Sequence, residues 1–497
     1  MTNYRGHLMN GWVCGINIED SSVVSKMAQS LSLDDSALEP NVFVSNGAVF
    51  YALPSKNGVE RVEVASSPEG VLNIFYNGHL TNAQRLRQHV KPKPKDNRDS
   101  SLILSLYKLR QRKCVHYLEG SFAFVIKDKD GFYAARDPLG VEPLYFTRQG
   151  DGWIFATQMK AFLPESKRIA ELLPGCYLDS RVGARRYFQI PHPVNTSINP
   201  QEVADLVGAL VLDAVHKALK ADSEVGIYLT GSVESCIIAA IAAQKNRRIK
   251  TFSVGLAGSQ DGHTARKVAA WLGADHTHVE VTEQEILENL STIIHTLESF
   301  DAPLVRHAVG DYFALKKASE SVQVIISGDA ANELFGGYPY LRPMFTEKLS
   351  AEIHAITQNL HRTHLQRWNR MTDAFGLEGR TPFTDRRLAH TVSRLPSNMK
   401  VSEDGRSKWC LRRAFSTQLP AWVVDRPDSD DTMFTCIQEV LKNYAETVFT
   451  DEDLKNHNAR EKEGYPNVRT KDELLYFQIW NSKFPLEYVP LVGRTVM

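Results

Sequence analysis

The sequence lacks the marks of a secreted, membrane-bound or zinc-binding protein. Its six cysteines are scattered and form no Cys-x-x-Cys pair, which argues against both a disulfide framework and a zinc site. No apolar run reaches the roughly 20 residues that a transmembrane helix needs, and residues 1–15 lack the apolar core of a secretory signal. We therefore expect a cytoplasmic protein without a membrane partner.

The sequence also lacks a net charge. The 58 lysines and arginines balance the 58 aspartates and glutamates, so bulk electrostatics favours neither a nucleic-acid nor a membrane partner. What the chain does have is length. Its 497 residues, 43% of them hydrophobic, are enough for about two to four domains with sizeable cores.

Residues 12–190 show a pattern of short strands with few long helices. Two helices are expected, Leu80–Val90 and Ser100–Leu109, and Asp99 or Ser100 is expected to cap the second. The order of elements fits an αββα sandwich. The strands expected here are Val71–Tyr76, Phe122–Lys127, Phe132–Ala135, Leu144–Phe146 and Trp153–Ala156.

The second half of the chain alternates strands with helices. Residues 189–200 contain three prolines and read as a linker. The alternation that follows predicts a parallel sheet with helices on both faces. The expected strands are Val225–Leu229, Lys250–Val254, His278–Val281 and Val322–Ile326. The expected helices are Gln201–Lys220, Ser235–Gln244, Asp261–Leu272 and Glu283–Phe300.

Two small, polar turns follow buried strands of this sheet. One runs from Thr230 to Cys236 and the other begins at Ser327. Because the carboxyl ends of parallel strands meet at one edge of a sheet, we expect the turns after Leu229 and Ile326 to lie side by side. Backbone N–H groups of such turns, together with a helix N-terminus, can hold phosphate. An α/β sheet presents a nucleotide site at this edge, so we expect a nucleotide there.

Longer segments resemble those of one known family. Residues 321–340 are similar to the Ser-Gly-Glu-Gly-Ala-Asp-Glu-Leu-Phe-Gly-Gly-Tyr segment of asparagine synthetases, and residues 365–385 and 408–415 are similar to two further segments of that family. Residues 118–124 and 135–145 resemble two signatures of class II glutamine amidotransferase domains. By this resemblance the chain is identified as a member of the asparagine synthetase family, whose relatives include β-lactam synthetases, carbapenam synthetases and lasso-peptide cyclases.

The resemblance implies a two-domain α/β fold. The N-terminal domain would be an αββα sandwich of the class II glutamine amidotransferase (Ntn-like) type. The C-terminal domain would be a parallel-sheet PP-loop ATP pyrophosphatase, which is adenine nucleotide α-hydrolase-like. The expected boundaries are an extension or propeptide at 1–13, the amidotransferase-like domain at 14–188, a linker at 189–200 and the synthetase-like domain at 201–497.

The resemblance also implies a glutaminase site. Cys14 matches the family's nucleophile, whose free α-amino group acts as its base. Asn77 and Gly78 match the oxyanion-hole pair, and Asp99 matches the aspartate that binds the α-amino group of glutamine. However, thirteen residues precede Cys14, and His79 replaces a glutamate of the family. Two alternatives remain: this half is a structural relic, or removal of the preceding residues frees an active glutaminase.

For the second half, the resemblance implies ATP and Mg²⁺ as cofactors. The residues implied to contact the nucleotide are Leu229, Thr230, Gly231, Ser232, Glu234, Ser235, Ser253, Val254, Gly255, Ser327, Gly328 and Lys408. The residues implied for the metal are Glu234 and Asn332, those for the substrate are Asp329 and Tyr338, and those for catalysis are Glu378 and Arg380. A structural ion pair between Glu378 and Arg380 is the alternative to their catalytic role.

Several of these positions depart from the family. Glu234 is one methylene longer than the family's aspartate. Asn332 and Asn369 each replace an aspartate, so the implied magnesium site has less negative charge than in the family. Asp428 stands where the family has a lysine over the α-phosphate. Unless another cation replaces this lysine, the reaction barrier rises by roughly a few kcal/mol. The candidate replacement cations are Lys408, Arg380, Arg412 and Arg426.

The function implied is that of an ATP- and magnesium-dependent ligase in specialised metabolism. It would adenylate a carboxylate, release pyrophosphate and form an amide with ammonia or with an amine of the substrate. The expected partner is a small-molecule carboxylate, with glutamine or ammonia as the nitrogen source, and a homodimer is left open. The competing hypothesis is a catalytically silent family member that serves as a scaffold or regulatory subunit.

Overall fold

The chain folds into two compact units, each with its own sheets and core. One comprises residues 1–189 with 373–376, and the other comprises residues 190–372 with 377–497. The computed structural model describes residues 11–31, 41–45, 47–52, 62–67, 69–91, 93–94, 96–163, 168–194, 198–220, 224–245, 248–259, 262–344, 346–427 and 435–496.

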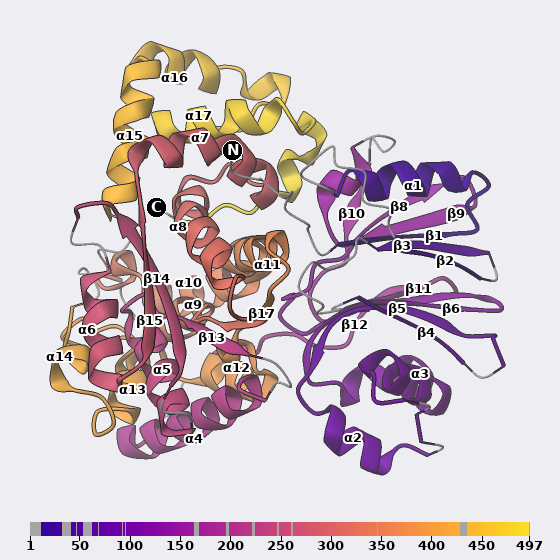
Figure 1. Ribbon diagram of the computed structural model, residues 1–497, viewed down its shortest axis with the longest axis horizontal. Coiled ribbons are helices and arrows are strands. Elements are labelled where there is room, and N and C mark those ends of the chain that lie inside the picture. Colours follow the sequence, from indigo (N-terminus) through magenta and orange to yellow (C-terminus); the bar gives the residue numbers. More distant parts are fainter. Residues whose placement is uncertain are drawn as a thin grey trace. The chain divides into compact units, whose positions relative to one another are not determined.

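Two six-stranded antiparallel sheets stack face to face in the first unit (Figure 1). The first sheet, in the order β10-β8-β9-β1-β3-β2, comprises β1 (Trp12–Ile16), β2 (Asn41–Ser45), β3 (Ala48–Ala52), β8 (Tyr145–Gln149), β9 (Gly152–Ala156) and β10 (Ala170–Glu171). The second, in the order β12-β11-β7-β6-β5-β4, comprises β4 (Val62–Ser66), β5 (Asn73–Leu80), β6 (Gly120–Asp128), β7 (Gly131–Arg136), β11 (Cys176–Asp179) and β12 (Gly183–Arg186). The outer layers are α1 (Ser21–Gln29) on the first sheet, and α2 (Ala83–His89) and α3 (Asp99–Arg110) on the second. The predicted αββα sandwich is confirmed.

The main core of this unit lies between the two sheets, because alternate strand residues point inward. In β3, residues 48, 50 and 52 are buried, whereas residues 49 and 51 are partly exposed. The rings of Phe50 and Phe75, one from each sheet, stack with their centroids 4.6 Å apart. A second cluster of buried side chains lies between the second sheet and α3.

A five-stranded parallel sheet forms the centre of the second unit (Figure 1). Its order is β15-β14-β13-β16-β17, with β13 (Val225–Tyr228), β14 (Lys250–Leu256), β15 (Asp275–Val281), β16 (Val324–Ile326) and β17 (Glu378–Arg380). Its helices are α4 (Pro200–Ala218), α5 (Val233–Lys245), α6 (His263–Leu272), α7 (Glu283–Leu297), α8 (Ala302–Ala318), α9 (Ala331–Phe335), α10 (Thr346–Asn359), α11 (His364–Ala374), α12 (Arg386–Arg394), α13 (Trp409–Ala414), α14 (Ala421–Val424), α15 (Thr435–Val448), α16 (Asp451–Asn458) and α17 (Lys471–Asn481). Of these, α5, α6, α8 and α15 pack against the sheet. The predicted parallel sheet is confirmed.

The predicted cap of α3 is wrong. The helix begins at Asp99, with Arg98 in the cap position, and the backbone N–H of Ser100 in its first turn donates to the Glu63 carboxylate at 2.8 Å. The carboxylate of Asp99 instead accepts a hydrogen bond from the backbone N–H of Leu80 at 2.8 Å. A contact with a strand far away in the sequence has therefore replaced the local cap.

Other boundaries shift by a few residues. Helix α7 ends at Leu297 rather than at residue 300, because Glu298 adopts the left-handed conformation with φ of 60°. Helix α6 begins at His263, and Asp261, where we predicted its start, lies outside the described residues. Within the described ranges, no helix is both long and apolar enough to cross a bilayer.

Candidate functional site

The turns that follow β13 and β16 lie side by side, as predicted. The two strands pair in parallel with Ile227 opposite Ile326, so their carboxyl ends reach the same edge of the sheet. Both turns line one cavity of about 140 Å³. The turn residues in its lining are Thr230, Ser232, Glu234, Ser327, Gly328 and Asp329.

The first turn gathers three hydroxyl groups, and the backbone N–H groups of Ser232 and Ser235 donate to two of them. Thr230 Oγ1 lies 2.9 Å from Ser232 Oγ and 3.2 Å from Ser235 Oγ. Gly231 has φ of 89°, in the left-handed region that favours glycine. Helix α5 begins at the next residue but one, Val233, so its first N–H groups are close to the turn. This arrangement suits an anion such as phosphate.

The second turn is tightly packed against the first. A Cβ atom on Gly328 would lie 2.5 Å from Cγ of Glu234, so no side chain fits there. The backbone N–H of Ser327 donates to the carbonyl of Arg380 at 3.0 Å. Ala330 stands where the family segment has glycine, yet it keeps a left-handed φ of 77°. The second turn therefore has a left-handed residue at this position without a glycine.

A buried ion pair connects the first turn to α13. Lys408 Nζ lies 2.6 Å from Glu234 Oε2, and both side chains are less than a tenth exposed. Burial alone would raise the pKa of Glu234, but the charge and the hydrogen bond of Lys408 outweigh burial and lower that pKa. The residue implied to hold magnesium is therefore ionised and already neutralised by a cation of the chain itself.

A second set of charges comes from α8 and α11, through two residues to which the sequence analysis assigned no role. Arg367 of α11 contacts both Asp311 of α8 and Asp329 of the second turn, and all three line the cavity. Burial raises the pKa of Asp329 to about 6, and the hydrogen bond from Ser327 opposes this shift. Asp311 lies in none of the segments that resemble the family, and Arg367 lies in one of them, residues 365–385, but was assigned no role there.

The site offers a magnesium ion few protein ligands. Within the part of the chain that the structure describes, no group of three or more His, Cys, Asp or Glu side chains is placed to hold a metal. Glu234 and Asn332, the two implied ligands, both line the cavity. Magnesium often uses one or two carboxylates and takes the remaining oxygens from phosphate and water. The donor set therefore fits magnesium only together with a phosphate ligand.

Ser253 of the predicted adenine-side strand, β14, contacts two histidines of the neighbouring β15 that we did not predict. Ser253 Oγ lies 3.1 Å from His276 Nε2 and 2.7 Å from His278 Nδ1. Burial lowers the pKa of His276 to about 4. The residues predicted for the nucleotide that do not line the cavity are Leu229, Gly231, Ser235, Ser253, Val254, Gly255 and Lys408.

Glu378 and Arg380 make structural contacts outside the cavity lining. Arg380 Nε lies 2.6 Å from Glu378 Oε1, and the same guanidinium donates to the carbonyls of Ala218 and Lys220, where α4 ends. Neither residue lines the cavity between the turns. These contacts favour the structural alternative, and a catalytic role stays a prediction.

The other candidate cations have backbone partners. Arg412 donates to the carbonyls of Ser407 and Val424, and Arg426 donates to the carbonyl of Gly231 in the first turn at 2.8 Å. Arg426 is therefore the candidate cation that, with Lys408, directly contacts the turn. Asp428, which replaces the family's lysine, lies outside the described residues.

In the first unit, the predicted glutaminase nucleophile lies within a strand. Cys14 is the third residue of β1, opposite Phe50 on one side and Phe155 on the other. Its side chain belongs to the apolar core between the sheets, and burial raises its pKa above the ordinary value. The thiol is therefore protonated and enclosed.

The other predicted glutaminase groups have partners within the protein. Asn77 Nδ2 donates to Glu142 Oε2 at 2.7 Å. Arg87 lies 3.0 Å from Asp99, the residue predicted to bind an α-amino group. Gly78 keeps the left-handed conformation, with φ of 137°. The amide of Asn77 and the carboxylate of Asp99, both predicted to serve a glutaminase site, are therefore engaged within the protein.

Comparisons with known proteins agree with this arrangement. A family model described as asparagine synthase matches residues 206–476, and one described as a glutamine amidotransferase domain matches residues 63–164. The chain is 30% identical to the probable glutamine-hydrolysing asparagine synthetase of Schizosaccharomyces pombe, over 86% of this chain and 84% of that protein. It is 30% identical to asparagine synthetase B of Escherichia coli, over 83% of this chain and 79% of that protein.

This chain belongs to the asparagine synthase family. The family consists of ATP-dependent carbon–nitrogen ligases. The two family models agree with the fold class observed here, an amidotransferase-type sandwich and a parallel-sheet synthase unit. A solved structure of glutamine phosphoribosylpyrophosphate amidotransferase from B. subtilis is 16% identical, over 54% of this chain and 65% of that chain, with a TM-score of 0.30, which is too low to bear on function.

Proposed function

We propose that this asparagine synthase family protein is an ATP- and magnesium-dependent ligase that adenylates a small-molecule carboxylate and forms an amide from it. The observation that carries the proposal is the cavity shared by the two turns. Hydroxyl groups, N–H groups and a helix N-terminus converge there at the carboxyl edge of a parallel sheet. Such an edge is where α/β sheets of this type bind nucleotides.

In this proposal the turns hold the phosphates of ATP. The first turn offers the hydroxyls of Thr230 and Ser232, and Glu234 with Asn332 would hold magnesium together with phosphate oxygens. Lys408, at 2.6 Å from Glu234, supplies a fixed positive charge close to the position where negative charge develops. Bound ATP supplies an activated α-phosphate for attack by the substrate carboxylate, with pyrophosphate as the leaving group.

The nitrogen source in this proposal is ammonia or an amine of the substrate. The Cys14 thiol is enclosed in the core and held protonated by burial, and the amide of Asn77 is bound to Glu142. A thiol in this state is a poor nucleophile. We therefore assign no glutamine hydrolysis to the first unit.

ATP–pyrophosphate exchange across a panel of carboxylates tests the ligase. We expect exchange with at least one carboxylate in the presence of magnesium. The Gly328→Ala variant should abolish exchange, because its methyl group would collide with Glu234. Gly208→Ala on α4 is the matched control, since its methyl group would meet only Ala414, at an ordinary 3.5 Å. Absence of exchange with every carboxylate would contradict the proposal.

A silent scaffold is the second candidate function. The observation that favours it is the neutralisation of Glu234 by Lys408 and of Asp329 by Arg367, since both carboxylates already have partners. A thermal-shift titration separates the two candidates. Mg-ATP should raise the apparent stability of a ligase by mass action, by about 2.7 kcal/mol at a concentration one hundred times Kd, and a scaffold without a nucleotide site should show no shift.

A further inference from the structure

A second cavity, of about 320 Å³, adjoins the one between the turns. The two cavities share His307, Glu333 and His364 in their linings. A molecule in the second cavity can therefore extend toward the turns. Tyr338 is the only one of the residues implied by the family resemblance that lines this second cavity, among those the structure describes.

One wall of the second cavity is the inner face of α10. Glu352, Ile356 and Asn359 lie at helical spacing on this face and line the cavity. Tyr340 donates to Glu352 Oε1 at 3.1 Å, and its ring stacks on that of Tyr338 with the centroids 5.9 Å apart. The wall thus combines two aromatic faces with a carboxylate.

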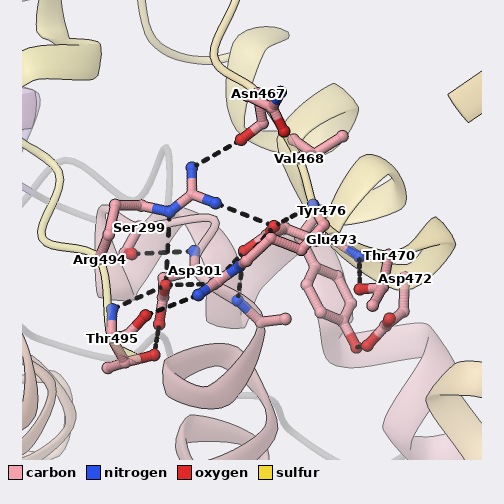
Figure 2. A network of polar contacts seen from close by, with 12 residues as sticks. Ser299, Asp301, Asn467, Val468, Thr470, Asp472, Glu473, Tyr476, Arg494 and Thr495 are labelled. Atoms are coloured by element: carbon pink, nitrogen blue, oxygen red, sulfur yellow. Dashed lines mark hydrogen bonds and ion pairs between the residues drawn. The ribbon is translucent and has the colours of Figure 1, made fainter. Parts of the chain in front are cut away.

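A second wall is a short strap, residues 494–496, which buried carboxylates hold in place (Figure 2). Thr495 donates to Asp301 through both its N–H, at 3.0 Å, and its hydroxyl, at 2.6 Å. Arg494 lies 2.9 Å from Glu473, and Arg469 contacts both carboxylates. Two arginines and two carboxylates balance in this network, so it adds no net charge to the cavity.

The charge that remains at the second cavity is negative. Glu333 and Glu352 line it; Glu333 faces His364 at 3.7 Å, so Glu352 is the carboxylate that the proposal depends on. Arg494 is the one arginine or lysine among the described lining residues, but Asp301 and Glu473 neutralise it. Burial lowers the pKa of His307 well below its ordinary value, so this ring is neutral. A negatively charged group would be repelled here, whereas a cation would be attracted by the carboxylates and by the tyrosine faces.

We propose that the second cavity binds the positively charged far end of the substrate whose carboxylate is activated at the turns. The substrate class is then a zwitterion with a carboxylate at one end, an apolar spacer, and a protonated amine or guanidinium at the other end. Pro303, Ile356 and Val496 provide apolar surface for the spacer. This inference rests on the proposed ligase function for the carboxylate end only.

Calorimetric binding to the full-length chain tests the inference without any catalysis. The probes are the ω-amino acids from 4-aminobutanoate to 8-aminooctanoate, with hexanoate and adipate as matched compounds that lack the amine. The ω-amino acid of fitting length should bind at least about tenfold more tightly than hexanoate, because a charged hydrogen bond to Glu352 is gained. Adipate should bind more weakly than either compound.

Two variants of α10 make the test specific. Glu352→Gln should weaken binding of the ω-amino acid about tenfold and leave that of hexanoate unchanged. Glu347→Gln is the control, since Glu347 is exposed on the same helix and lies outside the lining. Equal affinity for the ω-amino acid and hexanoate, equal effects of the two variants, or no binding of any probe would each overturn the inference.

The binding test of the second cavity and the exchange test of the ligase can fail independently of each other. Amine-dependent binding that Glu352→Gln weakens, without ATP–pyrophosphate exchange, supports the cavity assignment and contradicts the ligase. Exchange with carboxylates that lack a distal cation, and no preference for the ω-amino acid, supports the ligase and overturns the cavity assignment.

Discussion

The ammonium group of Lys408 lies 2.6 Å from the carboxylate of Glu234, and both groups are buried beneath the turn that we assign to phosphate binding. Burying two charges costs desolvation free energy, and their mutual attraction offsets this cost only when the two groups are in close contact. Loss of one partner leaves an uncompensated charge, whereas loss of both leaves none. The stability of the protein should therefore be sensitive to the loss of either partner alone.

Lys408→Met should lower the free energy of unfolding by about 3–5 kcal/mol, because Glu234 is left buried and unpaired. The double variant Glu234→Gln with Lys408→Met should recover most of that loss. Urea unfolding of the four proteins in the double-mutant cycle measures the coupling. Additive single effects would show that the two groups do not interact.

Glycine at position 330 should relieve local backbone strain. Ala330 has φ of 77°, which costs a non-glycine residue about 1–2 kcal/mol, although the lost methyl group offsets about 0.8 kcal/mol of the gain. Ala330→Gly should therefore leave stability unchanged or raise it by up to about 1 kcal/mol.

Ala331→Gly is the matched control for this prediction. Ala331 begins α9 with helical geometry, so glycine there should lower stability by roughly 0.5–1 kcal/mol. Thermal unfolding of the two variants in parallel gives the comparison. Equal losses at positions 330 and 331 would show that the left-handed conformation carries no strain.

Sequence reasoning located the two turns correctly but missed the charges around them. The turns follow from the rule that parallel strands end at one edge of a sheet, and that rule needs only the strand pattern. The Glu234–Lys408 pair spans 174 positions, and Arg367 meets Asp311 from a different helix. Contacts of this kind depend on how helices pack, and neither periodicity nor local motifs encode them.

The same limit explains the errors at short elements. β17 has only three residues, one of them glycine, and it is a strand because it pairs with β16. Asp99 or Ser100 was predicted to cap α3, but Asp99 instead accepts a hydrogen bond from the backbone N–H of Leu80 and pairs with Arg87; its binding of an amino group stays a prediction. In both cases a tertiary partner decided the outcome.

His276 should make the protein less stable at acidic pH. Burial holds its folded-state pKa at about 4, below the ordinary 6.5, so between these values the unfolded chain binds a proton that the folded chain does not. The free energy of unfolding should therefore fall as the pH is lowered through this window. On acidification, the free energy of unfolding of His276→Gln should fall by about 1–2 kcal/mol less than that of the unchanged protein. This figure allows for the partial exposure of the ring.

Urea unfolding at neutral pH and at roughly pH 4.5 measures this difference for the protein and for His276→Gln. An NMR titration of the ring protons gives the pKa of His276 directly. A ring that titrates near its ordinary value, or equal pH dependence of the two proteins, would contradict the prediction.

Cys14 should be unreactive in the folded protein. Its thiol lies in the core between the sheets, and burial raises its pKa, so the reactive thiolate is scarce. Labelling with a thiol reagent at mildly alkaline pH should modify Cys436, which is partly exposed, well before Cys14. Rapid labelling of Cys14 that glutamine suppresses would instead indicate a working glutaminase.

A chain shortened to begin at Cys14 should be less stable and should gain no glutaminase activity. β1 begins at Trp12, which pairs with Ala52 and is fully buried beside Phe50. Removal of Trp12 and Val13 takes two residues from a central strand, and loss of a buried tryptophan alone costs about 3–5 kcal/mol. Thermal unfolding and ammonia release from glutamine, measured on both chains, decide the matter. A shortened chain that is as stable as the longer one and hydrolyses glutamine would support the propeptide alternative. In such a chain the freed α-amino group of Cys14 would act as the base for its own thiol.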